Sequence, residues 1–246
     1  MRRAPVNPAV ESISAFFPCC NDEATIASMV RLAFGAIESV GADGEVIVID
    51  DGSADGSLHV LKELADVYPR LHVITHDRTR GYGGALLAGF EAATQQWVFY
   101  TDGDAQFDPS ELELLVAAAR DDVDVVQGYK LRRADSLGRR IVGRLYHRFV
   151  RLAFRLRVRD TDCDFRLIRA DALRRIRLVH TSGVICVELV RKLQDSGARF
   201  VEVPVHHYPR RHGRSQFFRP GRVGSSLVDL MGLWVRLVVL RRPPSR

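Results

Sequence analysis

Short apolar runs alternate with longer amphipathic stretches through the first half of the chain. The runs are rich in β-branched and aromatic residues, as is typical of buried strands. We expect strands at residues 12–17, 45–50, 71–75, 97–101 and 123–128. The stretches between them predict helices at residues 23–39, 54–67, 82–95 and 109–120. Nearly continuous apolar strands separated by helices indicate an α/β fold, with a mostly parallel sheet covered by helices on both faces.

Residues 130–159 follow another pattern, which predicts a basic amphipathic helix of about five turns. Its apolar positions recur every three or four residues: Leu137, Ile141, Leu145, Phe149, Leu152 and Leu156. Arginines run beside them: Arg140, Arg144, Arg148, Arg151 and Arg155. Two interpretations stay open, a core-packed helix with a solvated basic face and a helix lying on a membrane surface.

The rest of the chain completes the predicted fold. We expect a strand at 163–169, then a short helix, a helix at 184–195 and a strand at 200–208. The stretch 223–242 is apolar on most sides, but Asp229 and Arg236 interrupt it, so it predicts an interfacial helix or one docked on the sheet. No apolar run reaches about 18 residues, so we expect no membrane-spanning helix. We divide the chain into a domain at 1–217 and a basic amphipathic helix with a tail at 218–246.

The net charge of +6 is unevenly distributed along the 246 residues. Residues 130–159 hold eleven basic residues against one acid, and residues 206–246 hold nine arginines against one acid. The remainder therefore carries a net charge of −12. An acidic body with two basic segments indicates an anionic partner: nucleic acid, anionic lipid or phosphate.

Cysteine usage and the N-terminus indicate a cytosolic protein. The four cysteines form no CxxC pair and show no zinc spacing, so we expect reduced thiols. The N-terminal stretch "MRRAPVNPAVES" lacks the continuous apolar run of a signal peptide.

Acidic loops follow the first, second and fourth predicted strands: "NDE", "DDGSADGS" and "DGDAQ". Ligands of open α/β sheets bind beyond the carboxyl ends of the strands, so these loops predict one site. In extended backbone Asp102 and Asp104 would point the same way, and two such carboxylates favour a hard cation such as Mg²⁺ or Mn²⁺ between them. Taken alone, the segment also fits a polar turn.

Six segments, in order, resemble family 2 glycosyltransferases of the GT-A fold, and within them the polyprenyl-phosphate (dolichyl-phosphate-type) sugar synthases. They span about residues 12–217: "FFPCCNDEATI", "VIVIDDGSADGS", "RGYGGALLAGF", "YTDGDAQFDPSEL", "DTDCDFRLIRADAL" and "GARFVEVPVHHYPRRHGRSQF". The resemblance implies a Rossmann-like GT-A domain that binds a nucleoside diphosphate-sugar and Mg²⁺ or Mn²⁺.

Carried over to this sequence, the resemblance implies a set of donor-site residues. These are Pro18, Asn21, Glu23, Asp50, Asp51, Gly81, Asp102, Arg210 and Ser215, and Asp51 could instead shape the turn. The metal ligands would be Asp102, Asp104 and Gln106. Relatives have Lys where this chain has Gln216, so Arg211 or Arg214 could supply that charge.

The resemblance also implies the acceptor side of the site. It assigns acceptor-phosphate binding to Lys130, Arg132 and Arg133, and catalytic roles to Asp104, Asp160 and Arg133. A lipid phosphate is already an anion, so its attack needs no general base. Glu188 also matches a family acid, or is a helix-surface glutamate. Cys163 has no paired His in the sequence, so we disfavour a nucleophile there.

We therefore expect an inverting, metal-dependent hexosyltransferase that moves a sugar from a nucleoside diphosphate to polyprenyl phosphate. It would be cytoplasmic and peripheral on the cytosolic face of an anionic membrane. One alternative is a family 2 enzyme with a sugar or small-molecule hydroxyl as acceptor, using Asp160 or Glu188 as base. Another is a nucleic-acid-binding protein, which the acidic loops and the absence of a known binding module disfavour. We expect no nucleic-acid partner.

Overall fold

The computed structural model describes residues 7–131, 147–210 and 220–240. In this part of the chain the strands are β1 (Ser12–Cys19), β2 (Asp43–Asp50), β3 (Leu71–Thr75), β4 (Trp97–Thr101), β5 (Val125–Lys130), β6 (Phe165–Arg169) and β7 (Phe200–Val205). The helices are α1 (Glu23–Ser39), α2 (Ser57–Val67), α3 (Tyr82–Ala92), η1 (Pro109–Glu111), α4 (Leu112–Ala118), α6 (Ala170–Arg174), α7 (Ile185–Asp195), α8 (Pro220–Trp234) and η2 (Val235–Val239). A further helix covers residues 147–153.

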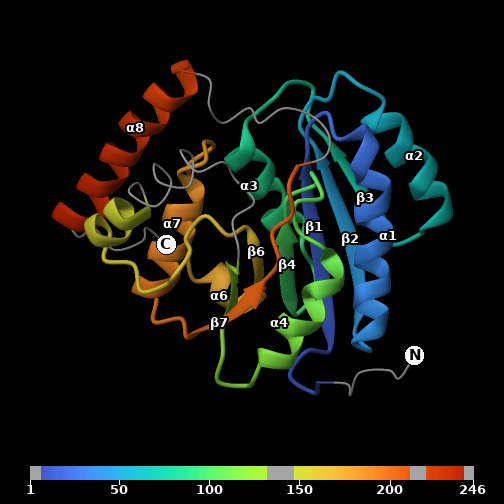
Figure 1. Ribbon diagram of the computed structural model, residues 1–246, viewed down its shortest axis with the longest axis horizontal. Coiled ribbons are helices and arrows are strands. Elements are labelled where there is room, and N and C mark those ends of the chain that lie inside the picture. The colour runs from blue at the N-terminus through green and yellow to red at the C-terminus, as the bar shows by residue number, and fades with distance from the viewer. Residues whose placement is uncertain (1–6, 132–146, 211–219, 241–246) are drawn as a thin grey trace.

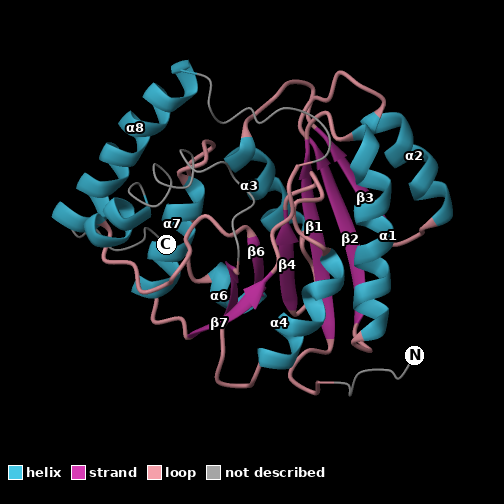
Figure 2. Ribbon diagram, viewed as in Figure 1, coloured by secondary structure: helices cyan, strands magenta, loops and turns pink. Residues whose placement is uncertain are grey.

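The described strands form one seven-stranded sheet in the order β3-β2-β1-β4-β6-β5-β7. β6 is antiparallel to both of its neighbours, whereas the other neighbouring pairs are parallel. Figures 1 and 2 show the sheet as the central layer, with α1 and α2 near its β3 edge and α8 beyond the opposite edge. The predicted α/β fold is confirmed, and the ends of the predicted elements before residue 130 lie within three residues of the observed ends.

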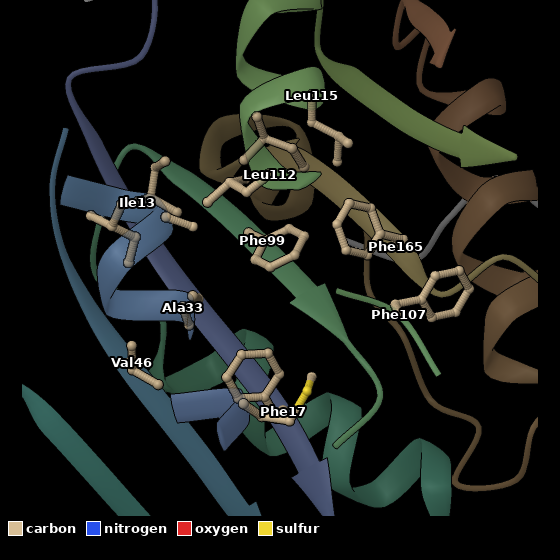
Figure 3. Packing of buried hydrophobic residues seen from close by; sticks show 14 of the residues in the cluster. Ile13, Phe17, Ala33, Val46, Phe99, Phe107, Leu112, Leu115 and Phe165 are labelled. Atoms are coloured by element: carbon tan, nitrogen blue, oxygen red, sulfur yellow. The ribbon is translucent and has the colours of Figure 1, made fainter. Parts of the chain in front are cut away.

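Side-chain alternation along the strands builds a core on each face of the sheet. Ile13, Phe17 and Phe99 point toward α1 and α4, where they meet Ala33 and Leu112 (Figure 3). On the other face the sheet packs on α3, α6 and α7. Because successive residues of a strand face opposite sides, continuous apolar strands must be covered on both.

A third helical layer lies outside α7, formed by the 147–153 helix and α8. Val150, Phe154 and Leu156 pack with Leu230 and residues of α7 in one buried cluster. The indole Nε1 of Trp234 donates to the Ala153 carbonyl at 3.0 Å, which ties α8 to the 147–153 helix. The C-terminal helix therefore packs mainly on other helices, and Phe200 of β7 is the sheet residue packed against their cluster (Figure 1).

The prediction of one continuous helix over residues 130–159 is wrong at both ends of this range, where the structure describes the chain. Lys130 belongs to β5, and the helical stretch described from residue 147 onward ends at residue 153. Arg155 has a positive φ of 53°, which ends the helix, and Leu156 then turns into the third-layer cluster. Phe149 and Leu152 are exposed beside Arg148 and Arg151. No helix in the described ranges is long and apolar enough to cross a membrane.

Candidate active site

The acidic loops meet at one edge of the sheet because β1, β2 and β4 are parallel. Cys19 lies opposite Asp50 in the β1–β2 register, so both strands end together. The loops that follow carry Asn21, Asp22 and Asp51 to this edge, and the loop after Thr101 joins them. The prediction that these loops form one site therefore agrees with the geometry of the sheet.

The segment "DTDCD" reaches the same edge from the opposite direction. Thr101, the last residue of β4, pairs with Phe165, the first residue of antiparallel β6. The residues just before β6 therefore lie at the same edge of the sheet as the residues just after β4. This brings Asp160 and Asp164 into the site. The sequence predicted the strand, but apolar runs carry no information about strand direction.

Asp102 and Asp104 lie in a turn and not in extended backbone. β4 ends at Thr101, and Ala105 has a positive φ of 57°. Asp104 is buried; its Oδ1 accepts from the Gln106 backbone N–H at 3.0 Å and its Oδ2 pairs with Arg210. The turn, and not the alternation we expected, thus presents the carboxylates.

Four carboxyl groups lie close together at this turn, those of Asp22, Asp102, Asp104 and Asp164. Burial, together with Asp164 and Asp104, raises the pKa of Asp102 well above its ordinary range. Burial, with a contribution from Asp104, raises the pKa of Asp22 to about 6, although the Arg210 guanidinium acts to lower it. The hydroxyl of Tyr82 donates to Asp102 Oδ1 at 2.8 Å.

These residues fit a divalent cation, because a second positive charge would relieve the repulsion among Asp22, Asp102 and Asp104. Carboxylate and amide oxygens are ligands that Mg²⁺ and Mn²⁺ prefer. Gln106, the third predicted ligand, lies in the same loop, and its Nε2 donates to the Tyr208 carbonyl at 3.2 Å. Arg210 neutralises part of this negative charge through its ion pair with Asp104.

The predicted nucleotide-binding residues form hydrogen bonds between the loop that follows β1 and the loop that follows β2. Asn21 Oδ1 accepts from the Ala54 N–H at 2.8 Å, and Glu23 Oε2 accepts from the Gly56 N–H at 3.0 Å. Asp50 is buried at the end of β2. Pro18 pairs with Ile49, the residue before Asp50 in β2, so it lies beside Asp50 at the same edge. Their contacts with a nucleotide stay a prediction.

Asp51 shapes the glycine loop. Its Oδ2 accepts from the Gly81 N–H at 2.9 Å, and its Oδ1 accepts from the Arg80 N–H at 2.8 Å and lies 2.7 Å from His76 Nδ1. Gly81 has a φ of 87°, a conformation in which a side chain would be strained. The turn-shaping alternative for Asp51 thus has direct geometric support, since its oxygens bond to the protein.

Lys130, predicted to bind the acceptor phosphate, carries positive charge to the side of the site formed by Asp160 and Asp162. Its Nζ donates to the Asp162 carbonyl at 2.6 Å and lies 5.7 Å from the centre of the Phe107 ring. Burial lowers the pKa of Lys130, but Asp160 and other acids outweigh it and raise the pKa, so the ammonium is retained. The other predicted acceptor residues, Arg132 and Arg133, and the donor-loop residue Ser215 lie outside the described residues.

A second group of possible metal ligands lies beside Lys130. One ligand atom from each of His147, Asp160 and Asp162 falls within 4.8 Å of the others. Asp160, predicted to be catalytic, is buried here and accepts from the Asp162 N–H at 3.2 Å. Because Lys130 already supplies a positive charge to Asp160, a metal ion here would compete with that ammonium.

Glu188 and Cys163 are unsuited to act as base or nucleophile. Glu188 is fully buried, and although burial acts to raise its pKa, hydrogen bonds from His180 and Lys192 lower it to about 2. Burial raises the pKa of Cys163 well above its ordinary range, which keeps the thiol protonated. Of the two interpretations left open for Glu188, the helix-surface glutamate is therefore wrong, and disfavouring Cys163 as a nucleophile agrees with its burial.

Sequence reasoning missed four residues of the site: Asp22, Tyr82, Asp164 and Arg166. Asp22 lies between two predicted residues of "NDE", and Tyr82 lies inside the glycine segment, so both had a local signal. Asp164 and Arg166 form a buried ion pair at 2.9 Å. Their position beside Asp102 depends on the direction of β6, which the sequence does not specify.

The model of the family described as Glycosyl transferase family 2 matches residues 14–177, which covers most of the site. The chain belongs to this family. The glycosyltransferase is also similar in fold to glucosyl-3-phosphoglycerate synthase from Mycobacterium tuberculosis. A structure of that enzyme with Mn²⁺ and uridine-diphosphate-glucose has a TM-score of 0.69 at 18% identity, and the match covers 90% of this chain and 79% of that one. A second structure of it, with Mg²⁺ and uridine-diphosphate, has a TM-score of 0.67 at 18% identity and covers 90% and 80% of the two chains. The fold predicted for this glycosyltransferase is thereby confirmed.

Proposed function

We propose that this glycosyltransferase transfers a sugar from a nucleoside diphosphate to polyprenyl phosphate at the cytosolic surface of a membrane, with inversion at the anomeric carbon. The donor and metal assignments draw support from the buried acids of the site and from the nucleotide and the Mn²⁺ or Mg²⁺ bound by the synthase of similar fold. One observation carries the acceptor assignment. The helical stretch with exposed Phe149 and Leu152 includes His147, which lies with Asp160 beside Lys130.

In this proposal Asp102, Asp104 and Gln106 hold the metal, which stabilises the charge that develops on the leaving diphosphate. Arg210, paired with Asp104, lies where a diphosphate oxygen would also be bound. Lys130 binds and orients the acceptor phosphate, whose own oxygen attacks the anomeric carbon. Because that oxygen is already anionic, no residue has to remove a proton, which agrees with a Glu188 that is unavailable as a base.

The membrane-facing surface in this proposal is formed by the 147–153 helix and α8. Leu152 is 78% exposed and Val228 73% exposed, and Met231 is exposed on the same α8. Exposed Arg148 and Arg151 flank Leu152, so apolar and cationic side chains alternate on one surface. An apolar surface fringed with arginines is complementary to an anionic bilayer, into which apolar side chains insert while guanidinium groups contact the lipid phosphates.

A second candidate acceptor is a small phosphorylated acid. A structure of the similar synthase holds Mn²⁺, uridine-diphosphate-glucose and phosphoglyceric acid, with a TM-score of 0.68 at 17% identity over 92% of this chain and 79% of that one. Lys130 could bind the phosphate of such an acceptor equally well. The exposed apolar surface would then have no part in catalysis.

A transfer assay with purified protein is expected to distinguish the two acceptors. The donors are labelled UDP-, GDP- and dTDP-sugars with Mn²⁺, and the acceptors are polyprenyl phosphate and phosphoglyceric acid. We expect label to enter the organic phase with one donor, and chelation of the metal to abolish transfer. Label found only in a water-soluble product would contradict the lipid acceptor and favour the second candidate.

Vesicle flotation tests the proposed membrane surface. We expect the protein to float with vesicles that contain phosphatidylglycerol and to bind phosphatidylcholine vesicles less well. Replacing Phe149 and Leu152 with Ser is expected to weaken binding by at least about tenfold, because each change removes apolar area from the bilayer. Val67, exposed on α2 at the far side of the sheet, provides the matched control V67S (Figure 1). Equal binding by F149S/L152S and V67S, or a gel shift of DNA in place of flotation, would contradict the membrane assignment.

A further inference from the structure

Glu188 lies at the centre of a buried network in α7 that the transfer reaction does not use. Its Oε2 accepts from the backbone N–H groups of Val179 and His180, at 3.2 and 3.0 Å, and lies 2.9 Å from His180 Nδ1. Its Oε1 accepts from Lys192 Nζ at 2.7 Å. With no exposed surface, this carboxylate fixes residues 179–180 to the helix behind them.

The segment fixed in this way, residues 179–182, packs against the start of α3 and bonds to its backbone. The Thr181 carbonyl accepts from the N–H groups of Gly83 and Gly84 at 2.8 and 3.3 Å. A Cβ atom on Gly83 would lie only 2.5 Å from the His180 carbonyl oxygen and 2.7 Å from that of Ser182. The two backbones are therefore in direct contact, and displacement of the segment would displace the glycine loop.

Tyr82 connects the start of α3 to the acids of the site. It lies between the glycines that meet the segment, and its hydroxyl donates to Asp102 Oδ1 at 2.8 Å. A continuous series of contacts thus runs from Glu188 through Thr181 and the first turn of α3 to Asp102.

We propose that Glu188 is a positioning residue: it holds residues 179–182 so that Tyr82 orients the carboxylate of Asp102 toward the metal. This inference rests on the proposed metal site, and it gives a role to an acid that cannot act as a base. Groups that orient metal ligands commonly alter metal affinity tenfold or more when they are removed.

The opposite end of the segment has its own anchor. Ser182 Oγ donates to Asp229 Oδ2 at 2.8 Å, which ties the segment to α8. Asp229 is the acid that interrupts the apolar C-terminal stretch, and this contact accounts for it. The variant Ser182→Ala therefore loosens the same segment without leaving a fully buried charge unpaired, because Asp229 is only half-buried and water can replace the hydroxyl.

The test measures Mn²⁺ affinity by electron paramagnetic resonance on the full chain, with neither donor nor acceptor present. Glu188→Gln is expected to weaken Mn²⁺ binding about tenfold, and Tyr82→Phe to act similarly. If both act through one series of contacts, the double variant is expected to bind about as weakly as the weaker single variant and not a hundredfold more weakly than the native chain. Glu113→Gln, at an exposed position of α4, makes the same chemical change away from the network.

Hydrogen exchange supplies a second readout, which is independent of the metal. The amides of Gly83 and Gly84 are expected to exchange faster in Glu188→Gln and in Ser182→Ala than in Glu113→Gln. A lower melting temperature with native Mn²⁺ affinity and native exchange at these amides would overturn the proposal and leave Glu188 a structural residue. If Glu188→Gln does not fold, native Mn²⁺ affinity and native exchange in Ser182→Ala would overturn it equally.

Failure of this inference can be told from failure of the proposed function. Mn²⁺ binding that depends on Glu188 in a protein that transfers no sugar would reject the proposed reaction and support the positioning role. Sugar transfer to lipid with Mn²⁺ affinity unchanged by Glu188→Gln would do the reverse.

Discussion

Replacing Asp104 with Asn is expected to lower kcat/KM for sugar transfer by at least about a thousandfold while the fold stays intact. A thousandfold loss corresponds to about 4 kcal/mol of transition-state stabilisation, the order expected when charge stabilisation at a leaving group is lost. Asp104 is buried and bonds to both the Gln106 N–H and Arg210. Asparagine preserves the shape of the side chain but removes the negative charge that a metal ion requires.

Asp108 provides the matched control, since it belongs to the same acidic segment but has another role. Its Oδ1 accepts from the Ser110 N–H at 2.9 Å and caps the start of η1. Asn caps helices about as well as Asp, so Asp108→Asn is expected to keep both activity and stability. Steady-state kinetics as a function of Mn²⁺ concentration, with thermal melting beside them, makes the comparison. Full activity of Asp104→Asn with native metal dependence would rule out Asp104 as a metal ligand.

The sheet could be predicted because its strands are so apolar that only burial on both faces explains them. β1 and β4 show no exposed positions, and the helices between strands have apolar positions at helical spacing, such as Ile26, Met29 and Val30 in α1. The edge that carries the site followed from this, because parallel strands end together. What the apolar pattern lacked was direction: β6 runs antiparallel, and that alone brings Asp164 to Asp102.

The basic segment shows where periodicity misleads. Leu152 and Leu156 are four residues apart, as on one helix face, yet Leu152 is exposed and Leu156 is buried after the chain turns at Arg155. A spacing of four residues does not reveal that the backbone has left the helix. Glu188 is a related case among the acids. Its ion pair with Lys192 has the i,i+4 spacing of the predicted helix, but its contact with His180 depends on how the segment before α7 folds.

Replacing Arg166 with Met is expected to have the largest effect on stability, lowering the free energy of unfolding by about 3–5 kcal/mol. Arg166 is fully buried in β6, where it pairs with Asp164 and donates to the Gln127 side chain and the Thr161 carbonyl. Met fills a similar volume but leaves the Asp164 carboxylate buried without its partner. For a chain of this size, such a loss lowers the melting temperature by about 10 °C or more.

Three further variants identify the cause of that loss: Arg174→Met, Asp164→Asn and the double variant Arg166→Met/Asp164→Asn. Arg174→Met removes an exposed ion pair with Asp171 on α6, and it is expected to change stability by less than about 0.5 kcal/mol. Adding Asp164→Asn to Arg166→Met is expected to recover part of the loss, because the second change removes the unpaired charge. Denaturant unfolding of the native chain, the three single variants Arg166→Met, Asp164→Asn and Arg174→Met, and the double variant measures these differences. If the double variant were less stable by the sum of its two single changes, the loss would come from packing, and the buried ion pair would not be what stabilises the junction of β4, β6 and β5.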